Sequence, residues 1–240
     1  MKFQTIGNPN DSLIIMLPGS FCPSSGLNYL YEKLKDDYCI VLVEYNGHYE
    51  NSTFSSRQNE AKGIVEYIQK QNIHTIKMIY GQSMGAEIAI ELFKQLEKTN
   101  IDVDYCFLDG ASCIKLPYLY KKFMYFKFNQ ILKMMKKTDV DQILNMKLIK
   151  KIARGNIENL RPMIEPMAVT AQFLSKESVK NETECCYTFD FPLFDKEAQN
   201  KMYFFYGKEE KAYKTCYRGV KKAYPQSNSI FKEGYGHLWT

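Results

Sequence analysis

The sequence has little of what metal sites, disulfide frameworks and membrane spans require. Histidine occurs only three times in 240 residues, at His48, His74 and His237. The seven cysteines are scattered, and none forms a Cys-x-x-Cys pair, which favours reduced thiols over a disulfide framework or a zinc site. No apolar run approaches the roughly 18 residues of a membrane-spanning helix, and residues 1–12 lack the pattern of a signal peptide. We therefore expect a cytoplasmic protein that uses no metal and no cofactor.

Length and composition indicate one soluble globular domain, with room for an insertion. A chain of 240 residues can bury one substantial core but is short for two large domains. Its hydrophobic content of 45% and charged content of 25% exclude disordered and fibrous classes. The net charge of +5 is local, because residues Lys115 to Lys137 contain seven lysines and no acid. The rest of the chain therefore carries about −2.

The pattern of apolar residues predicts an α/β fold. Short buried strands are expected at 12–17, 39–43, 75–80 and 103–108, and helices with one apolar face at 26–35, 57–71 and 86–96. This alternation is typical of parallel strands in a mainly parallel, doubly wound sheet.

The alternation stops after residue 112. The following stretch is mainly helical, with a possible capping box at Thr138 and Asp141 and a helix stop at Gly155. Strand signals resume at 201–206 and 229–231, around a helix at 211–224. We therefore predict a core formed by residues 1–112 and 200–240, interrupted by a helical insertion at 113–199.

The stretch "MIYGQSMGAEIAIEL" places a serine between two glycines. Ser83 falls between a predicted strand and a predicted helix, which is the context of a nucleophile elbow. Gly81 and Gly85 leave room for a tight turn with Ser83 in an unfavourable backbone conformation, and the helix N-terminus favours developing negative charge. The pattern predicts that Ser83 is a nucleophile. The alternative is that Ser83 only caps the helix.

A serine nucleophile needs a base to accept its proton. His74 precedes a strand and is therefore expected at the opposite end of the sheet from Ser83. His48 follows the second predicted strand, at the correct end, but in a loop with many other possible uses. His237 follows the last strand in "EGYGHLW" and is the preferred base. The alternative for His237 is an exposed residue of the C-terminal tail.

An acid should orient the imidazole of the base. Glu209 and Glu210 follow the strand "KMYFFYG" and can reach the same edge, with Glu210 preferred. Asp109, at the end of another strand, is a rival. The alternative for both glutamates is a solvated position at a helix N-terminus, where negative charge is favourable.

In these motifs the chain resembles the α/β-hydrolase superfamily. The resemblance rests on the elbow "GQSMG", an acid after a late strand and a histidine near the C-terminus, in the order Ser, acid, His. It covers nearly the whole chain and implies that the helical stretch is a lid. In that family the loop after an early strand usually reads His-Gly, and the next residue supplies an oxyanion-hole amide. Here the loop is "MLPGSF", so the resemblance implies amides of Ser20 and Met84 as donors.

The resemblance also bears on residues outside the triad. The loop "NGHYENS" is similar to the family's Gly-His segment, which implies a structural role for His48, with a substrate-pocket role as the alternative. We do not expect the terminal helix that many members have, and the expected acid is a glutamate where aspartate is commoner.

The lysine-rich segment Lys115 to Lys137 also carries six aromatic residues. We expect the aromatic side of this helix to pack against its own core or over an acyl pocket, and the lysines to lie on the outer side. One expectation is that these lysines only keep the outer side in contact with water. The alternative is that they attract an anionic membrane or an acidic carrier. No recognised motif supports nucleic-acid binding.

The sequence therefore predicts a serine hydrolase that cleaves an ester or thioester with an apolar acyl group. A peptidase or amidase of the same superfamily is an alternative, and it calls for an acidic pocket group that binds a free amine. A hydrolase-like binding module with an idle triad is the alternative from another class, because the fold alone does not choose the chemistry.

Overall fold

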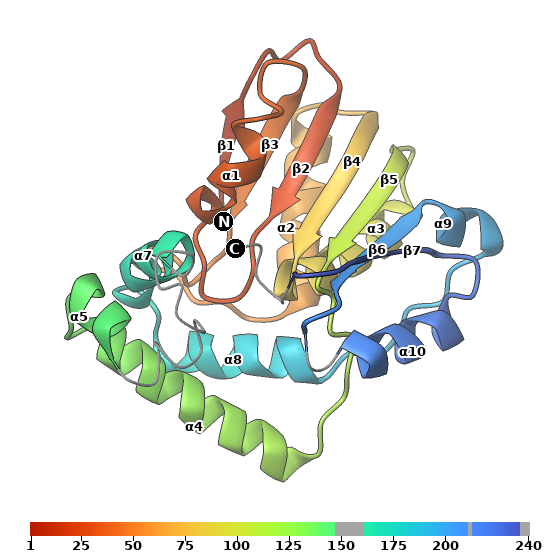
Figure 1. The fold of residues 1–240 in the computed structure, drawn as a ribbon. Coiled ribbons are helices and arrows are strands. Elements are labelled where there is room, and N and C mark those ends of the chain that lie inside the picture. The colour runs from red at the N-terminus through yellow and green to blue at the C-terminus, as the bar shows by residue number, and fades with distance from the viewer. Residues whose placement is uncertain (147–160, 211–212, 236–240) are drawn as a thin grey trace.

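The computed structural model describes residues 1–146, 161–210 and 213–235 and forms a seven-stranded sheet (Figure 1). The strands are β1 (Lys2–Ile6), β2 (Leu13–Leu17), β3 (Cys39–Glu44), β4 (Thr75–Gln82), β5 (Asp102–Asp109), β6 (Met202–Gly207) and β7 (Asn228–Lys232). Their order is β1-β3-β2-β4-β5-β6-β7, and only β1 is antiparallel to its neighbour. The predicted mainly parallel sheet is confirmed, with all six predicted strands.

The strand that the sequence did not reveal is β1. Most of its side chains are exposed, so Lys2–Ile6 lacks the continuous apolar run that marks the buried strands, such as β2, in which every residue is buried. Its backbone pairs with β3 along the edge of the sheet, with Phe3 opposite Val43. Tertiary pairing, and not local hydrophobicity, makes this segment a strand.

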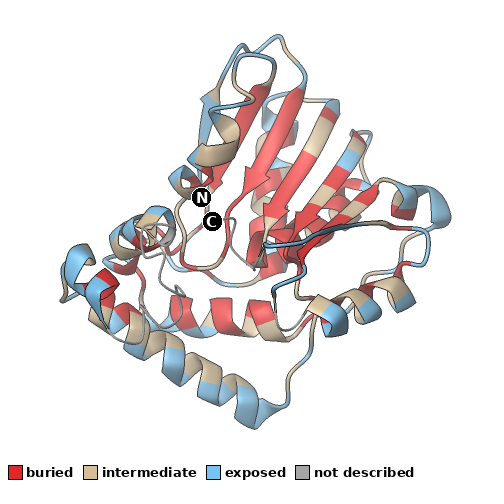
Figure 2. Cartoon of the chain, in the orientation of Figure 1, coloured by how far each residue is buried: buried red, intermediate tan, exposed pale blue. Residues whose placement is uncertain are grey.

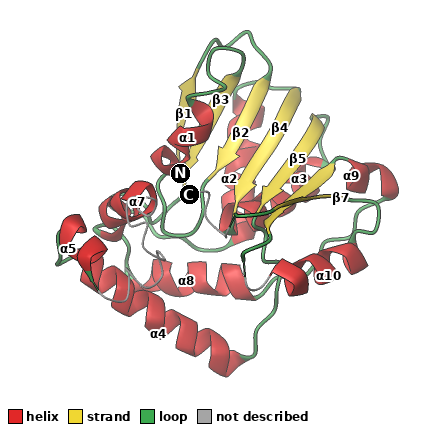
Figure 3. Ribbon diagram, in the orientation of Figure 1, coloured by secondary structure: helices red, strands yellow, loops and turns green. Residues whose placement is uncertain are grey.

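Helices cover both faces of the sheet, as Figure 3 shows. The larger core lies under α2 (Arg57–Lys70), α3 (Met84–Leu96) and α10 (Tyr213–Ala223). The short helices η1 (Ser24–Leu27) and α1 (Asn28–Tyr31) cover the other face, over a smaller core that includes Met16 and Leu42. The helix predicted at 26–35 is thus present but starts earlier and ends sooner.

Between β5 and β6 the chain forms five described helices. They are α4 (Tyr118–Met135), α5 (Val140–Asn145), α7 (Arg161–Ala171), α8 (Lys176–Tyr187) and α9 (Lys196–Asn200). Four of them, α4, α5, α7 and α8, enclose a separate hydrophobic core that includes Leu132, Ile143 and Val179. In Figure 1, α8 runs below the carboxyl ends of the strands, and α4 lies beyond it.

One expectation about this region is wrong, and another is not tested. The N-cap of α5 is Asp139, whose side chain accepts a hydrogen bond from the Asp141 amide at 2.9 Å, and not Thr138. The reason is that the Thr138 amide donates to the Met134 carbonyl, which holds Thr138 in the turn that follows α4. The predicted stop at Gly155 lies outside the described residues.

The aromatic residues of α4 do not all face inward. Tyr125 and Phe128 pack against this separate core of the insertion, hereafter the insertion core. Phe123 and Phe126 are about 60% exposed, and Tyr118 and Tyr120 are 70% and 63% exposed. Figure 2 shows the buried strands at the centre of the molecule and exposed residues along α4. An 18-residue helix can bury only one side, and the aromatic residues here are distributed around its circumference.

Candidate active site

Ser83 occupies the tight turn between β4 and α3. Its backbone has φ 54° and ψ −117°, a conformation that costs a residue with a side chain roughly 1–3 kcal/mol. The Ser83 amide donates a hydrogen bond to the Asp109 carbonyl at 2.7 Å, which fixes the turn against β5. The strained turn has the local geometry expected of a nucleophile elbow.

The two flanking glycines are needed because the backbone is crowded. A Cβ on Gly81 would lie 2.3 Å from the Gly85 carbonyl oxygen, and a Cβ on Gly85 would lie 2.3 Å from the Leu17 carbonyl oxygen. Both distances are too short for any side chain. The close approach of β2, β4 and α3 therefore explains the glycine on each side of the serine.

Ser83 lines a cavity of about 320 Å³ between the sheet and the insertion. The floor comes from the turn after β2 and from the elbow, including Gly19, Ser20 and Met84. The opposite wall comes mostly from α4, α7 and α8 and is largely apolar: Met124, Phe128, Ile131, Leu132, Met167 and Tyr187. A group bound at Ser83 would therefore sit between backbone amides and apolar side chains.

The amides predicted as oxyanion donors belong to this cavity. Ser20 and Met84 both line it, and neither backbone amide donates to another described residue. Met84 is the first residue of α3, so its amide is one of the free N–H groups at a helix N-terminus. Both donors are thus available to a ligand, and their role in catalysis stays a prediction.

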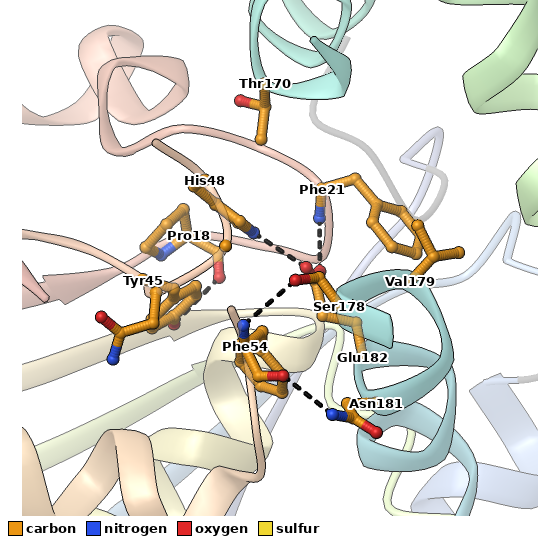
Figure 4. Close-up of polar contacts among 12 residues, drawn as sticks. Pro18, Phe21, Tyr45, His48, Phe54, Thr170, Ser178, Val179, Asn181 and Glu182 are labelled. Carbon is orange, nitrogen blue, oxygen red and sulfur yellow. Dashed lines mark hydrogen bonds and ion pairs between the residues drawn. The ribbon is translucent and has the colours of Figure 1, made fainter. Parts of the chain in front are cut away.

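The turn that carries Ser20 is held by the insertion at the next residue, Phe21 (Figure 4). The Phe21 amide donates to Oε2 of Glu182 on α8 at 2.8 Å, and the Phe21 ring packs in the insertion core, 5.1 Å from the Phe128 ring. Phe21 itself has φ 60°, which is unusual for a bulky residue. Contacts from the insertion therefore stabilise the strained backbone next to Ser20.

The other carboxylate oxygen of Glu182 binds His48. His48 Nε2 lies 3.0 Å from Glu182 Oε1, and His48 Nδ1 lies 3.4 Å from Glu44 Oε1. Burial by itself lowers the pKa of His48, but the charge of Glu182 and the contacts with both carboxylates outweigh it and raise the pKa to about 10. His48 is therefore an imidazolium at neutral pH, which suits a structural role and not that of a base.

Further contacts fix α8 to the same loops. The Ser178 hydroxyl accepts from the Phe54 amide at 3.1 Å, and the Asn181 side chain donates to the Phe54 carbonyl at 2.9 Å (Figure 4). On the neighbouring loop, the Tyr45 hydroxyl donates to the Pro18 carbonyl at 3.1 Å. The turn after β2, the loop with His48 and α8 therefore form one connected unit.

No family model matches the sequence, and none of the curated proteins compared with it matches either. Solved structures match over nearly the whole chain. One is an alpha/beta hydrolase family protein from Desulfitobacterium hafniense, 17% identical, with a TM-score of 0.72 over 98% of this chain and 91% of that one. Another is an esterase from Exiguobacterium antarcticum, 18% identical, with a TM-score of 0.67 over 98% of this chain and 87% of that one. A third is an N-formylmaleamic acid deformylase from Pseudomonas putida, 12% identical, with a TM-score of 0.67 over 98% of this chain and 89% of that one. The chain has the α/β-hydrolase fold.

In this hydrolase fold the candidate acids differ in their surroundings. Glu210 is partly buried, and its Oε2 is shielded from solvent, whereas Glu209 is exposed. Asp109 is 3% exposed, and its carboxylate accepts from the Tyr80 hydroxyl at 2.8 Å. Burial favours Glu210 over Glu209, and the predicted base His237 lies outside the described residues, so the triad stays a prediction.

The remaining histidine, His74, lies where the sequence placed it. It directly precedes β4, at the end of the strand opposite Ser83, and lines a separate hollow of about 550 Å³ there. Ligands of open α/β sheets bind outside the carboxyl ends of the strands. We therefore expect a ligand in the cavity at Ser83 and not in the hollow at His74. Among the described residues no cluster of three or more His, Cys, Asp or Glu side chains could hold a metal ion.

One carboxyl group in the cavity was not singled out in the sequence. Glu87 lies one turn after Ser83 on α3, is 1% exposed and lines the cavity. Its Oε1 accepts from the Cys113 amide at 3.0 Å, and its Oε2 lies 3.8 Å from Nη1 of Arg57. Burial raises the pKa of Glu87 to about 8, with Arg57 opposing the rise. Its position in an otherwise apolar helical face was the available signal. Glu182 is equally buried, but it lies in a polar stretch of the sequence, so no comparable signal marks it.

The two thiols that line the cavity are poor nucleophiles. Burial raises the pKa of Cys22 to about 12 and raises that of Cys186 as well. A thiol reacts as its thiolate, which is scarce at neutral pH under these conditions. Ser83 therefore stays the predicted nucleophile of this site.

Proposed function

We propose that the protein is a serine hydrolase that cleaves a carboxylic ester or thioester with an apolar acyl group. One observation carries the proposal: a serine in a strained strand-to-helix turn faces a mainly apolar cavity, beside two backbone amides without other described partners. Structural similarity to esterases and other hydrolases supports the general class.

The mechanism follows from the roles assigned to the residues. Ser83 Oγ attacks the carbonyl carbon while His237 accepts its proton, and Glu210 orients the imidazole. The amides of Ser20 and Met84 donate to the oxyanion, and loss of one such donor typically costs about 100- to 1,000-fold in kcat. His237 then protonates the leaving group, and water releases the acyl group from Ser83.

The cavity favours a small, neutral acyl group. Its volume of about 320 Å³ lies near the lower end of the roughly 300–1,000 Å³ typical of ligand pockets. A peptidase alternative requires an anionic group to bind a free amine. Glu87 is the acid in the described cavity lining, but its raised pKa leaves it mainly protonated near neutral pH. This favours acyl esters and thioesters over aminoacyl substrates.

Labelling with a fluorophosphonate probe tests the nucleophile directly. We expect the folded protein to be labelled once, and Ser83→Ala to lose the label while it keeps the same thermal stability within a few degrees. Failure of the folded wild-type protein to react would favour the binding module with an idle triad.

A substrate panel tests the acyl preference. Nitrophenyl esters of rising chain length would be compared with thioester and aminoacyl substrates. We expect turnover of short and medium acyl chains, and loss of that turnover in His237→Ala. Turnover of aminoacyl substrates alone would replace the esterase assignment by the peptidase one.

A further inference from the structure

The outer side of α4 carries an apolar stripe in contact with solvent. Leu119, Phe123 and Phe126 are 76%, 60% and 59% exposed. Their spacing of four and three residues places them on one side of the helix. The stripe is a local concentration of large apolar side chains, a feature that usually marks an interaction surface.

None of the hydrophobic cores formed by the described residues includes this stripe. The opposite side of α4 supplies Met124, Phe128 and Leu132 to the cavity wall, and Leu132 is buried in the insertion core. The helix is therefore already packed on one side. Replacement of the exposed stripe by polar residues would leave that packing intact.

Lysines flank the stripe on both sides. By helical geometry Lys122 and Lys133 lie on one side of it and Lys127 on the other. None of these three forms an ion pair with another described residue, whereas Lys115 and Lys121 pair with acids. With no acid between residues 115 and 137, the anions that would balance the flanking lysines must come from outside this segment.

We propose that the outer side of α4 docks on an anionic lipid surface. An apolar stripe bordered by cations matches the layers of a bilayer interface, where the rings of Phe123 and Phe126 enter the acyl boundary and the lysines meet the phosphates. The 18-residue helix, about 27 Å long, would lie in the plane of the surface. None of the described helices combines the length and the apolar composition needed to cross a bilayer.

This surface is distinct from the cavity but adjacent to it. The inner side of the same helix forms part of the cavity wall, so docking would bring the cavity next to the lipid. Docking itself requires no catalysis. A Ser83→Ala protein should therefore bind vesicles as the wild type does, which separates this proposal from the proposed function.

Vesicle sedimentation provides the test. The wild type should bind phosphatidylcholine vesicles in which a third of the lipid is phosphatidylglycerol, and should bind pure phosphatidylcholine vesicles at least tenfold more weakly. High salt should weaken the binding, because exposed charges are screened beyond about 3 Å at 1 M ionic strength.

Two sets of variants separate the contributions. Replacement of Lys122, Lys127 and Lys133 by Gln should weaken binding about 100-fold, at roughly fivefold for each lysine near an anionic surface. Phe123→Ser combined with Phe126→Ser should weaken binding at least tenfold with little change in thermal stability.

The matched control removes the same charge elsewhere. Lys33, Lys70 and Lys98 are also exposed, and their replacement by Gln lowers the net charge equally. Equal loss of binding in this control would show attraction by net charge alone and would overturn the proposal. It would also be overturned by the absence of binding to anionic vesicles at low salt, or by a dimer that the Phe123→Ser, Phe126→Ser protein no longer forms.

Discussion

Substitution of Glu182 tests how the insertion controls the candidate oxyanion turn. Glu182 is fully buried and binds two groups, the Phe21 amide at 2.8 Å and His48 Nε2 at 3.0 Å. Glu182→Gln keeps an oxygen that can accept from Phe21 but removes the charge. Glu182→Ala removes both. The pair of variants therefore separates the electrostatic contribution of Glu182 from its role as an acceptor.

The electrostatic contribution follows from the protonation of His48. Its pKa of about 10 in the folded protein lies above the unfolded value of 6.5, so the imidazolium stabilises the fold below that range. At pH 7, three pH units below the folded pKa, this amounts to about 4 kcal/mol at 1.36 kcal/mol per unit. Both Glu44 and Glu182 contribute to this stabilisation, and the contribution of Glu182 is the larger. We expect Glu182→Gln to lower the free energy of unfolding by about 2–3 kcal/mol.

The sign of the pH dependence is fixed by the same shift. Because the folded pKa is raised, the stabilisation is fully present below pH 6.5 and is lost as the pH rises through about 10. The difference in the free energy of unfolding between wild type and Glu182→Gln should therefore shrink as the pH rises from 7 to 10. Urea unfolding at a series of pH values measures this difference.

The acceptor role should appear in catalysis. Without Glu182 the Phe21 amide loses its buried partner, and the adjacent Ser20 amide is free to shift. A displacement of about 1 Å can cost about 100-fold in rate. We expect kcat to fall about 10- to 100-fold in Glu182→Ala with a smaller change in KM, and Glu182→Gln to keep most of the wild-type kcat.

Glu177→Gln is the matched control, because Glu177 is an exposed acid on the same helix. It should change neither the stability nor kcat appreciably. The reasoning is refuted if Glu182→Gln shows a pH-independent loss of stability, or if both Glu182 variants lose the same fraction of kcat.

Three further predictions concern the elbow and its neighbours. Gly85→Ala should lower the free energy of unfolding by about 3 kcal/mol or more in urea, because the 2.3 Å approach to the Leu17 carbonyl outweighs the roughly 1 kcal/mol by which alanine favours a helix. Ser83→Gly should be about 1 kcal/mol more stable than Ser83→Ala in thermal unfolding, because glycine adopts φ 54° without strain; equal stability would argue against a strained turn. The raised pKa of Glu87 should make wild-type stability fall as the pH rises from about 4.5 to 8, and Glu87→Gln should remove that slope in urea titrations.

The elbow could be predicted because its signals are local. The apolar run before Ser83, the two glycines and the helical pattern after it all lie within fifteen residues, and the backbone conformation follows from that short stretch. Strands such as β2, β3 and β6 could be predicted for the same reason, since each is mostly a run of apolar or aromatic residues. The edge strand β1 has no such run, and only its pairing with β3 identifies it.

The contacts around the elbow had no comparable signal. Glu182 lies 161 residues from Phe21 in the sequence, within an ordinary polar helical stretch. Nothing in its neighbours indicates that it is fully buried. Likewise, the aromatic residues of α4 indicate a helix with apolar character but not which of them face solvent.

By itself the sequence determined six of the seven strands, the helices of the sheet core and the serine turn between two glycines, because these depend on interactions between near neighbours in the chain. Only the tertiary structure decided which carboxylates are buried, that His48 is an imidazolium between two of them, and which side of α4 remains open. Burial, and the pKa of a buried group, depend on segments that come into contact only after folding. When these segments are far apart in the chain, the local sequence does not indicate which of them will be in contact.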